Sequence, residues 1–319
     1  MKQRVKWVDM CKGLVMILTV YMHCGLSSIP YISSIVNIFY MPLFFILSGL
    51  FMNTDKYIGV MAFIKHRWYT LYRPFLFFFL VVMTLAKPFK APLDSWPMYI
   101  ENTLVGGGGG YALWFIPVLA LAEVLNYILG WYCSSCVRSL FLLFCAGLSY
   151  TAYICDLTPY WNIFFVPAAA FFYGFGSQLK KWLFLIDKKM DTKSVCGFAF
   201  IMFLVSLLCL CLPTKPEWFI NKLSTPLVYP LSIIGSLSVF FGFIAYSRSQ
   251  SKIFVWFGNL LTYVGRNTFV ILAFHQVTLQ LISASGIKSG MLVRLLMWLI
   301  MVLLIELINR YFPSLLGKS

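Results

Sequence analysis

The segment LVYPLSIIGSLSVFFGFIAYS (Leu227–Ser247) contains 21 residues and no Asp, Glu, Lys or Arg. A helix needs about 20 consecutive apolar residues to cross the hydrocarbon core of a bilayer, so this segment predicts a transmembrane helix. Nine further apolar segments of similar length predict an all-α polytopic membrane protein with about ten transmembrane helices. The predicted spans are Lys12–Ser33, Ile35–Asn53, Tyr72–Lys87, Ala112–Gly130, Arg138–Cys155, Trp161–Leu179, Val195–Leu212, Leu227–Ser247, Arg266–Ser285 and Met291–Arg310.

The composition agrees with a membrane protein and excludes several other classes. Of the 319 residues, 61% are hydrophobic and 11% are charged, whereas soluble domains carry about 25% charged residues. A water-soluble protein, a disordered chain and a nucleic-acid binder are therefore excluded, although the formal net charge is +15. We expect one membrane-embedded domain over residues 1–319, with no separate soluble domain and with membrane lipid as a partner.

The positive charges are distributed unevenly between the two sides that the predicted spans define. Cytoplasmic segments of membrane proteins are enriched in Lys and Arg. If the N-terminus lies in the cytoplasm and the spans alternate, 19 of the 25 Lys and Arg fall on the cytoplasmic side. This asymmetry predicts cytoplasmic termini and an even number of spans. The six residues on the opposite side are Lys87, Lys90, Lys215, Lys222, Lys288 and Arg294.

Three features outside the spans have a distinctive composition. The segment from Pro88 to Tyr111 contains five consecutive glycines, which cannot hold a fixed shape alone, so it is interpreted as either a flexible tether or a mobile lid. The segment Lys252–Gly265 is amphipathic and too short to span, and we expect it to lie along the membrane surface or to extend the next helix. Cys133 and Cys136 form a lone C-x-x-C without a second pair or a neighbouring His, so no metal site is predicted.

The first apolar segment carries the densest set of ionisable residues, in RVKWVDMCKGLVMILTVYMHCG (Arg4–Gly25). At 100° per residue, Lys12 and His23 lie only about 20° apart around a helix axis and about 16 Å apart along it. Asp9 falls on the same face. Ionisable groups inside a bilayer are costly and mark functional sites, and this row suits a charged donor that enters from the cytoplasm. The alternative is that His23 is a hydrogen-bonded packing residue.

The pattern W-x-D-x-x-K-G-L…H, with ten residues between Lys12 and His23, resembles the opening of the acyltransferase type 3 family of membrane-bound O-acyltransferases. It is most similar to the branch of sugar O-acetylases. Further segments resemble the family in the same order along nearly the whole chain, and ten spans is the family's architecture. These segments are MPLFFILSGLFM (Met41–Met52), ALWFIP (Ala112–Pro117), PAAAFFYGFGSQLKK (Pro167–Lys181) and GRNTFVILAFHQ (Gly265–Gln276).

The resemblance implies roles for individual residues. The family has Arg or Lys at the position of Lys12 and a catalytic His at the position of His23. It also has two basic residues three apart just before the third helix. Here FIKHRWYTLYRP supplies Arg67, but Thr70 occupies the second position, and Arg73 lies one helical turn further on.

The chemistry of acetyl transfer agrees with these roles. A neutral imidazole suits a base that takes the proton of an attacking hydroxyl, and the phosphates of acyl-CoA need cationic partners. Lys65 and Arg67 are also explained by the ordinary excess of positive charge on the cytoplasmic side. Three polar or aromatic residues within the spans are candidates for binding the acceptor, and each has an alternative explanation. The alternative is a helix–helix hydrogen bond for Glu123, a pairing with a polar neighbour for His275, and a place in the aromatic belt at the membrane surface for Trp114. The predicted site residues are His23 and Asp9 as catalytic residues, Lys12, Arg67 and Arg73 as cofactor-binding residues, and Glu123, His275 and Trp114 as substrate-binding residues.

The resemblance therefore implies a membrane-bound O-acetyltransferase of the bacterial inner membrane. It would move an acetyl group from acetyl-CoA to a hydroxyl of a cell-surface polysaccharide or lipid-linked glycan precursor, with His23 as general base or transient acyl carrier. Proteins of polysaccharide biosynthesis are further expected partners. The alternative is a proton-coupled transporter or flippase of a polysaccharide precursor, in which His23 and Asp9 would couple protons. A third possibility is a non-catalytic assembly partner of a polysaccharide synthase.

Overall fold

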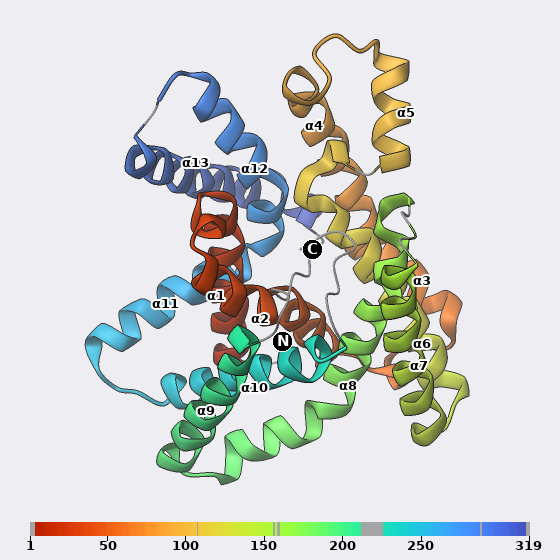
Figure 1. The fold of residues 1–319 in the computed structure, drawn as a ribbon, viewed down its shortest axis with the longest axis vertical. Coiled ribbons are helices and arrows are strands. Elements are labelled where there is room, and N and C mark those ends of the chain that lie inside the picture. The colour runs from red at the N-terminus through yellow and green to blue at the C-terminus, as the bar shows by residue number, and fades with distance from the viewer. Residues whose placement is uncertain are drawn as a thin grey trace. The chain divides into compact units, whose positions relative to one another are not determined.

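The computed structural model describes residues 4–106, 108–155, 157, 160–211, 226–287 and 289–316. All regular secondary structure in these ranges is helical (Figure 1), which confirms the predicted all-α class. The α-helices are α1 (Lys6–His23), α2 (Pro30–Gly49), α3 (Val60–Arg67), α4 (Arg73–Lys90), α5 (Trp96–Gly106), α6 (Phe115–Tyr132), α7 (Ser135–Ile154), α8 (Val166–Lys189), α9 (Thr192–Ser206), α10 (Val228–Ser247), α11 (Lys252–Arg266), α12 (Thr268–Ala284) and α13 (Gly290–Tyr311).

Each predicted span overlaps a helix, and the boundaries differ most at the first one. The prediction of a single helix over Lys12–Ser33 is wrong, because α1 ends at His23 and α2 begins at Pro30. Gly25 lies between them with a φ of 100°, a left-handed conformation that glycine adopts without steric cost and that commonly ends helices. The predicted end of the seventh span, Leu212, lies outside the described residues.

Fewer helices qualify as membrane spans than the sequence predicts. Within the described residues, six helical segments are long and apolar enough to cross a membrane, or seven if α11 and α12 form one span. The helices α1 and α9 lie at predicted spans but are not among them. The helix α1 carries three charged residues, Lys6, Asp9 and Lys12, within 18 residues, and α9 is too short, with 15 residues. The chain is thus an integral membrane protein with about six apolar spans, while ten spans and cytoplasmic termini remain predictions. The six segments are Tyr31–Gly49, Val60–Lys90, Tyr111–Tyr132, Ser135–Ala152, Val228–Ser247 and Gly290–Tyr311.

Much of the described part of the segment from Pro88 to Tyr111 is helical. The helix α5 occupies Trp96–Gly106, and a 3₁₀ turn, η4, covers Gly108–Trp114. Tyr111 has a φ of 49° and donates its hydroxyl hydrogen bond to Gln280 on α12. The segment therefore ends on a side chain that is anchored to a helix. Five residues of the charge count lie outside the described residues, namely Lys2, Lys215, Lys222, Lys288 and Lys318.

The helices group into two compact units. The first contains α1, α2 and α7 to α11, and the second contains α3 to α6, α12 and α13. In the first unit, α1 packs against α2, α10 and α11, and α10 packs against α2 and α9. In the second unit, α3 packs against α6, and α4 packs against the turn η4. A single membrane-embedded domain remains a prediction.

Glycines allow two helix pairs of the first unit to meet backbone to backbone. A Cβ atom at Gly13 of α1 would collide with the carbonyl oxygen of Leu261 on α11, and one at Gly265 of α11 would collide with the carbonyl oxygen of Asp9. In the same way, Gly49 of α2 abuts the carbonyl oxygen of Tyr173 on α8. Small residues are the usual means of such close approach between membrane helices. In Figure 1, α1 and α11 accordingly lie side by side.

The C-terminus of α8 is tied to two other helices of the same unit. Trp7 of α1 donates its indole N–H to the Asp187 carboxylate at 3.0 Å. Arg248 donates one N–H to the Asp187 carbonyl oxygen at 2.6 Å and another to the Met190 carbonyl oxygen at 2.8 Å. Carbonyl groups at the end of a helix lack hydrogen-bond donors within the helix, and Arg248 provides donors for two of them. Beyond this end, Asp191 caps α9, and hydrogen bonds from the Ser194 side chain and backbone N–H lower the pKa of Asp191.

The backbone contact at Gly265 leads to a stability prediction. The variant Gly265→Ala is expected to lower the free energy of unfolding by about 1–3 kcal/mol, the usual cost of overpacking, because the new Cβ collides with backbone that cannot move aside. The matched control is Gly242→Ala on α10, where a Cβ meets nothing within 4 Å, so the higher helix propensity of Ala should keep or raise stability. Thermal unfolding of both variants in the same lipid measures the difference. An unfolding midpoint of Gly265→Ala at or above that of the wild type would contradict the contact.

Candidate functional site

The helix α1 carries three of the predicted site residues on one face. It is helical without interruption from Lys6 to His23, so the regular spacing of an α-helix applies to Asp9, Lys12 and His23. Lys12 and His23 are separated by about three turns, or about 16 Å. All three residues belong to the first unit. The structure thus presents them in a row along a single rigid element.

Asp9 is fixed by an ion pair with an arginine that the sequence analysis did not assign. The Asp9 carboxylate oxygen Oδ2 lies 3.2 Å from Nε of Arg266, the last residue of α11. Asp9 is buried, while the side chain of Arg266 is half exposed. Gly265, next to Arg266, is the residue that abuts the Asp9 carbonyl oxygen. Both the backbone and the side chain of Asp9 therefore contact the end of α11.

Lys12 and His23 have different surroundings on α1. The Lys12 ammonium lies 5.4 Å from the centre of the Phe51 ring, a distance at which a cation is attracted to the face of an aromatic ring. Within the described part of the chain, no carboxylate oxygen lies within 4.0 Å of this ammonium. His23 is half-buried and is the last residue of α1, whose end is closed by a hydrogen bond from Cys24 N–H to the Tyr21 carbonyl.

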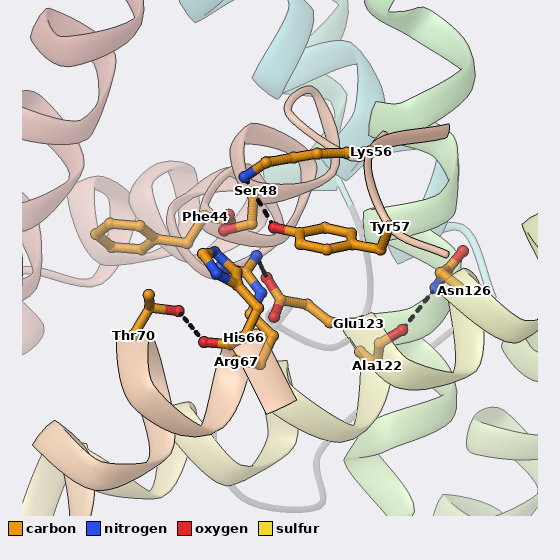
Figure 2. A network of polar contacts seen from close by, with 10 residues as sticks. All are labelled: Phe44, Ser48, Lys56, Tyr57, His66, Arg67, Thr70, Ala122, Glu123 and Asn126. Carbon is orange, nitrogen blue, oxygen red and sulfur yellow. Dashed lines mark hydrogen bonds and ion pairs between the residues drawn. The ribbon is translucent and has the colours of Figure 1, made fainter. Parts of the chain in front are cut away.

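The second unit brings together two predicted site residues, Arg67 and Glu123. Nη2 of Arg67, at the end of α3, lies 2.6 Å from Oε1 of Glu123 in α6 (Figure 2). The Glu123 side chain is 3% exposed and the Arg67 side chain 29% exposed. Arg67 Nε and Glu123 Oε2 are buried and have no hydrogen-bond partner within the described ranges. The sequence analysis assigned the two residues to different ligands, and their pairing depends on tertiary packing that it could not provide.

Aromatic side chains surround this ion pair. Phe63 lies under the Arg67 guanidinium at 5.6 Å and stacks on Tyr127 with ring centres 4.2 Å apart. Tyr127 donates its hydroxyl hydrogen bond to the Thr54 carbonyl at 3.0 Å. His66 lies beside Tyr57, with ring centres 5.1 Å apart (Figure 2). The sequence analysis assigned no role to these aromatic residues or to His66, and only their position around Arg67 draws attention to them.

The remaining predicted residues of the second unit are held in different ways. Arg73 is exposed and is the first residue of α4. The Trp114 ring packs edge-on against Phe165 at 5.8 Å. His275 is fully buried in α12, and its Nδ1 lies 2.8 Å from the Ile271 carbonyl oxygen. Because a carbonyl only accepts, Nδ1 carries the proton and Nε2 is the acceptor in the neutral ring.

Thr70, which stands where a second basic residue was expected, is engaged with the backbone. It lies in the π-helical turn η3 (Trp68–Tyr72) and donates its hydroxyl hydrogen bond to the His66 carbonyl at 3.0 Å. Cys133 and Cys136 are free cysteines. Among the residues that the structure describes, no group of three or more His, Cys, Asp and Glu could hold a metal ion.

Comparison with known proteins gives one match that covers most of the chain. A family model described as an acyltransferase domain matches residues 5–308. No curated protein and no solved structure matches the chain. The matched range includes every residue of the candidate site.

The ion pair between Asp9 and Arg266 leads to a prediction about coupling. Arg266→Gln is expected to lower the free energy of unfolding by about 1–3 kcal/mol, because it leaves the buried Asp9 carboxylate without its charged partner. Asp9→Asn is expected to lower it by less, about 0–1 kcal/mol, because the Arg266 side chain is half exposed. The double variant is expected to lose no more than the larger single loss, since paired residues act as one unit. Thermal unfolding of the four proteins in the same lipid measures this coupling, with Lys252→Gln, an exposed charge on α11, as a neutral control. If the losses of the two single variants add up in the double variant, Asp9 and Arg266 do not stabilise each other, and the prediction is wrong.

Proposed function

The chain belongs to the acyltransferase type 3 family, whose model covers residues 5–308, and from this membership we propose that it is a membrane O-acetyltransferase. It takes the acetyl group of acetyl-CoA and transfers it to a hydroxyl of a cell-surface polysaccharide or of a lipid-linked glycan precursor. Membership in the family and an integral membrane location make the chain a membrane acyltransferase. The donor, the acceptor and a location in a bacterial inner membrane are parts of the proposal.

The observation that supports this function best is the row of side chains on α1. Lys12 and His23 stand on one uninterrupted helix, so a donor bound by its anionic end near Lys12 would extend its thioester toward His23. The separation of about 16 Å suits a donor whose charged nucleotide lies far from its reactive thioester. Geometry of this kind converts a bimolecular reaction into one between positioned groups.

In the proposed reaction, His23 acts as the general base. The acceptor hydroxyl oxygen attacks the thioester carbonyl carbon as its proton moves to the imidazole of His23. The tetrahedral intermediate then releases the sulfur of CoA, and the imidazolium returns the proton to that sulfur. The products are an acetyl ester and free CoA, and His23 is restored. Asp9, the second predicted catalytic residue, lies on the same face of α1 and is held there by its ion pair with Arg266.

The proposed donor site uses cations with different surroundings. Among the described residues, no carboxylate oxygen lies within 4.0 Å of the Lys12 ammonium, which lies beside the Phe51 ring, and a phosphate is a favourable partner for such an ammonium. Arg67 and Arg73 stand at the end of α3 and the beginning of α4, on either side of the turn η3. We assign all three to the anionic part of acetyl-CoA.

The proposed acceptor site uses polar and aromatic groups of the second unit. His275 is a buried side chain whose ring nitrogen can accept a hydrogen bond from a sugar hydroxyl. Glu123, which the sequence analysis also assigned to the acceptor, is instead paired with Arg67. The half-buried ring of Trp114 offers an apolar face of the kind on which a sugar ring packs. Proteins that synthesise the glycan are the further partners that this function requires.

Acetyl-CoA turnover by the purified protein in lipid tests the function. Lipid-linked glycans extracted from the host are supplied as acceptor, and release of free CoA is measured for the wild type and for His23→Ala. The expected result is release by the wild type and a loss of at least about 100-fold in the variant, the usual contribution of general base catalysis.

The control is Tyr21→Phe, which changes one atom on the same turn of α1 and should retain turnover. Thermal unfolding shows whether the three proteins are equally folded. Equal release by the wild type and His23→Ala would remove His23 as the catalyst. Absence of both CoA release and acetyl-CoA binding would contradict the proposed function and favour transport of a glycan precursor.

A further inference from the structure

The ion pair between Arg67 and Glu123 joins a buried carboxylate to a partly exposed guanidinium. Glu123 is 3% exposed, whereas 29% of the Arg67 side chain is exposed. A single short contact, Nη2 to Oε1 at 2.6 Å, joins the two. Glu123 therefore holds Arg67 from the protein interior, while part of the Arg67 side chain remains exposed.

The contact uses only a fraction of the bonding capacity of the two groups. Guanidinium has five N–H donors, and a carboxylate often binds two of them in a parallel fork. Among the described residues, Arg67 Nε and Glu123 Oε2 are buried and have no hydrogen-bond partner. Only Nη2 of Arg67 is bound to Glu123, so the N–H groups left for a second anion are those of the two Nη nitrogens.

A second contact limits the movement of the guanidinium. Its carbon Cζ lies 5.6 Å from the centre of the Phe63 ring, which itself stacks on Tyr127. Tyr127 is anchored by its hydroxyl bond to the Thr54 carbonyl. Arg67 is consequently held on one edge by Glu123 and on one face by a fixed aromatic stack, as Figure 2 shows for its position beside Glu123.

We propose that Glu123 is a positioning residue that holds Arg67 for the phosphate groups of the acyl donor. This inference rests on the proposed function and specifies how one cation of the donor site is oriented. Thr70 has its hydroxyl bound to the His66 carbonyl and carries no charge, so Arg67 has no basic neighbour three residues further on. The chain has one basic residue here in place of two, and Glu123 compensates by fixing the direction in which the N–H groups of Arg67 point.

The test compares two acetyl donors that differ in their phosphates. Acetyl-CoA carries the phosphorylated nucleotide, and S-acetylpantetheine has the same thioester without any phosphate. For Glu123→Gln, the KM for acetyl-CoA is expected to rise about tenfold, the effect of one charge-assisted hydrogen bond, with little change in kcat. For S-acetylpantetheine, kcat/KM should remain within about twofold of the wild type, the limit expected for independent sites.

Two further variants identify the route of the effect. If Glu123 acts through Arg67, the double variant Arg67→Ala/Glu123→Gln should bind acetyl-CoA no more weakly than Arg67→Ala alone. The matched control is Asp187→Asn, which removes the carboxylate of another arginine pair, 3.7 Å from Arg248, and should leave the KM of both donors unchanged.

The outcomes separate this inference from the proposed function. Failure of the wild type to transfer acetyl from either thioester would overturn both. Activity of the wild type with an equal loss for both donors in Glu123→Gln would overturn only the positioning role and would favour contact of Glu123 with the acceptor. Additive losses in the double variant would also overturn it. If Glu123→Gln does not fold, Glu123→Asp retracts the carboxylate by one methylene and should give the same dependence on the donor.

Discussion

The contact between α1 and the end of α11 is the interaction on which the first unit depends. Gly265 lets the backbone of α11 reach the Asp9 carbonyl, and the neighbouring Arg266 binds the Asp9 carboxylate. Backbone contact fixes the distance between the helices, and the ion pair fixes the rotation of α1 about its axis. Because α1 is one continuous helix, this rotation also determines where Lys12 and His23 point. A structural contact at one end of the helix therefore sets the geometry of the residues along it.

Arginine is a suitable partner for the carboxylates of Asp187 and Glu123 because one guanidinium can bond several groups at once. Arg248 lies near the Asp187 carboxylate and donates to the carbonyls of Asp187 and Met190. Among the described residues, Arg67 bonds only Glu123 through Nη2, and its Nε has no partner. The difference follows from position, since Arg248 faces the free carbonyls of a helix end. Arg248 thus joins two segments through both of its Nη groups, whereas Arg67 makes a single contact.

The sequence predicted the helices well because an apolar run of about 20 residues has few alternatives. Leu227–Ser247 coincides with α10 to within one residue. It failed at the break after His23, where Gly25 and Pro30 are of the residue types that end and begin helices, because an apolar run alone does not show such a break and the left-handed φ of Gly25 does. The sequence also grouped Asp9, Lys12 and His23, because they share one helix. It missed the partners Arg266 and Glu123, which are 257 and 56 residues from Asp9 and Arg67, because packing brings them together.

Lys12 and Arg67 illustrate two ways to keep a cation available inside an apolar protein. The Phe51 ring attracts the Lys12 ammonium through its quadrupole and leaves the net charge intact. Glu123 instead holds Arg67 through one ion-pair contact between Nη2 and Oε1, in which the two opposite charges offset each other. In a medium of low dielectric constant, an unneutralised charge exerts a strong attraction over a distance, while a neutral pair acts only on contact. By this argument an unpaired ammonium such as that of Lys12 acts on an anion at a distance, whereas a paired guanidinium such as that of Arg67 acts through the direction of its N–H groups.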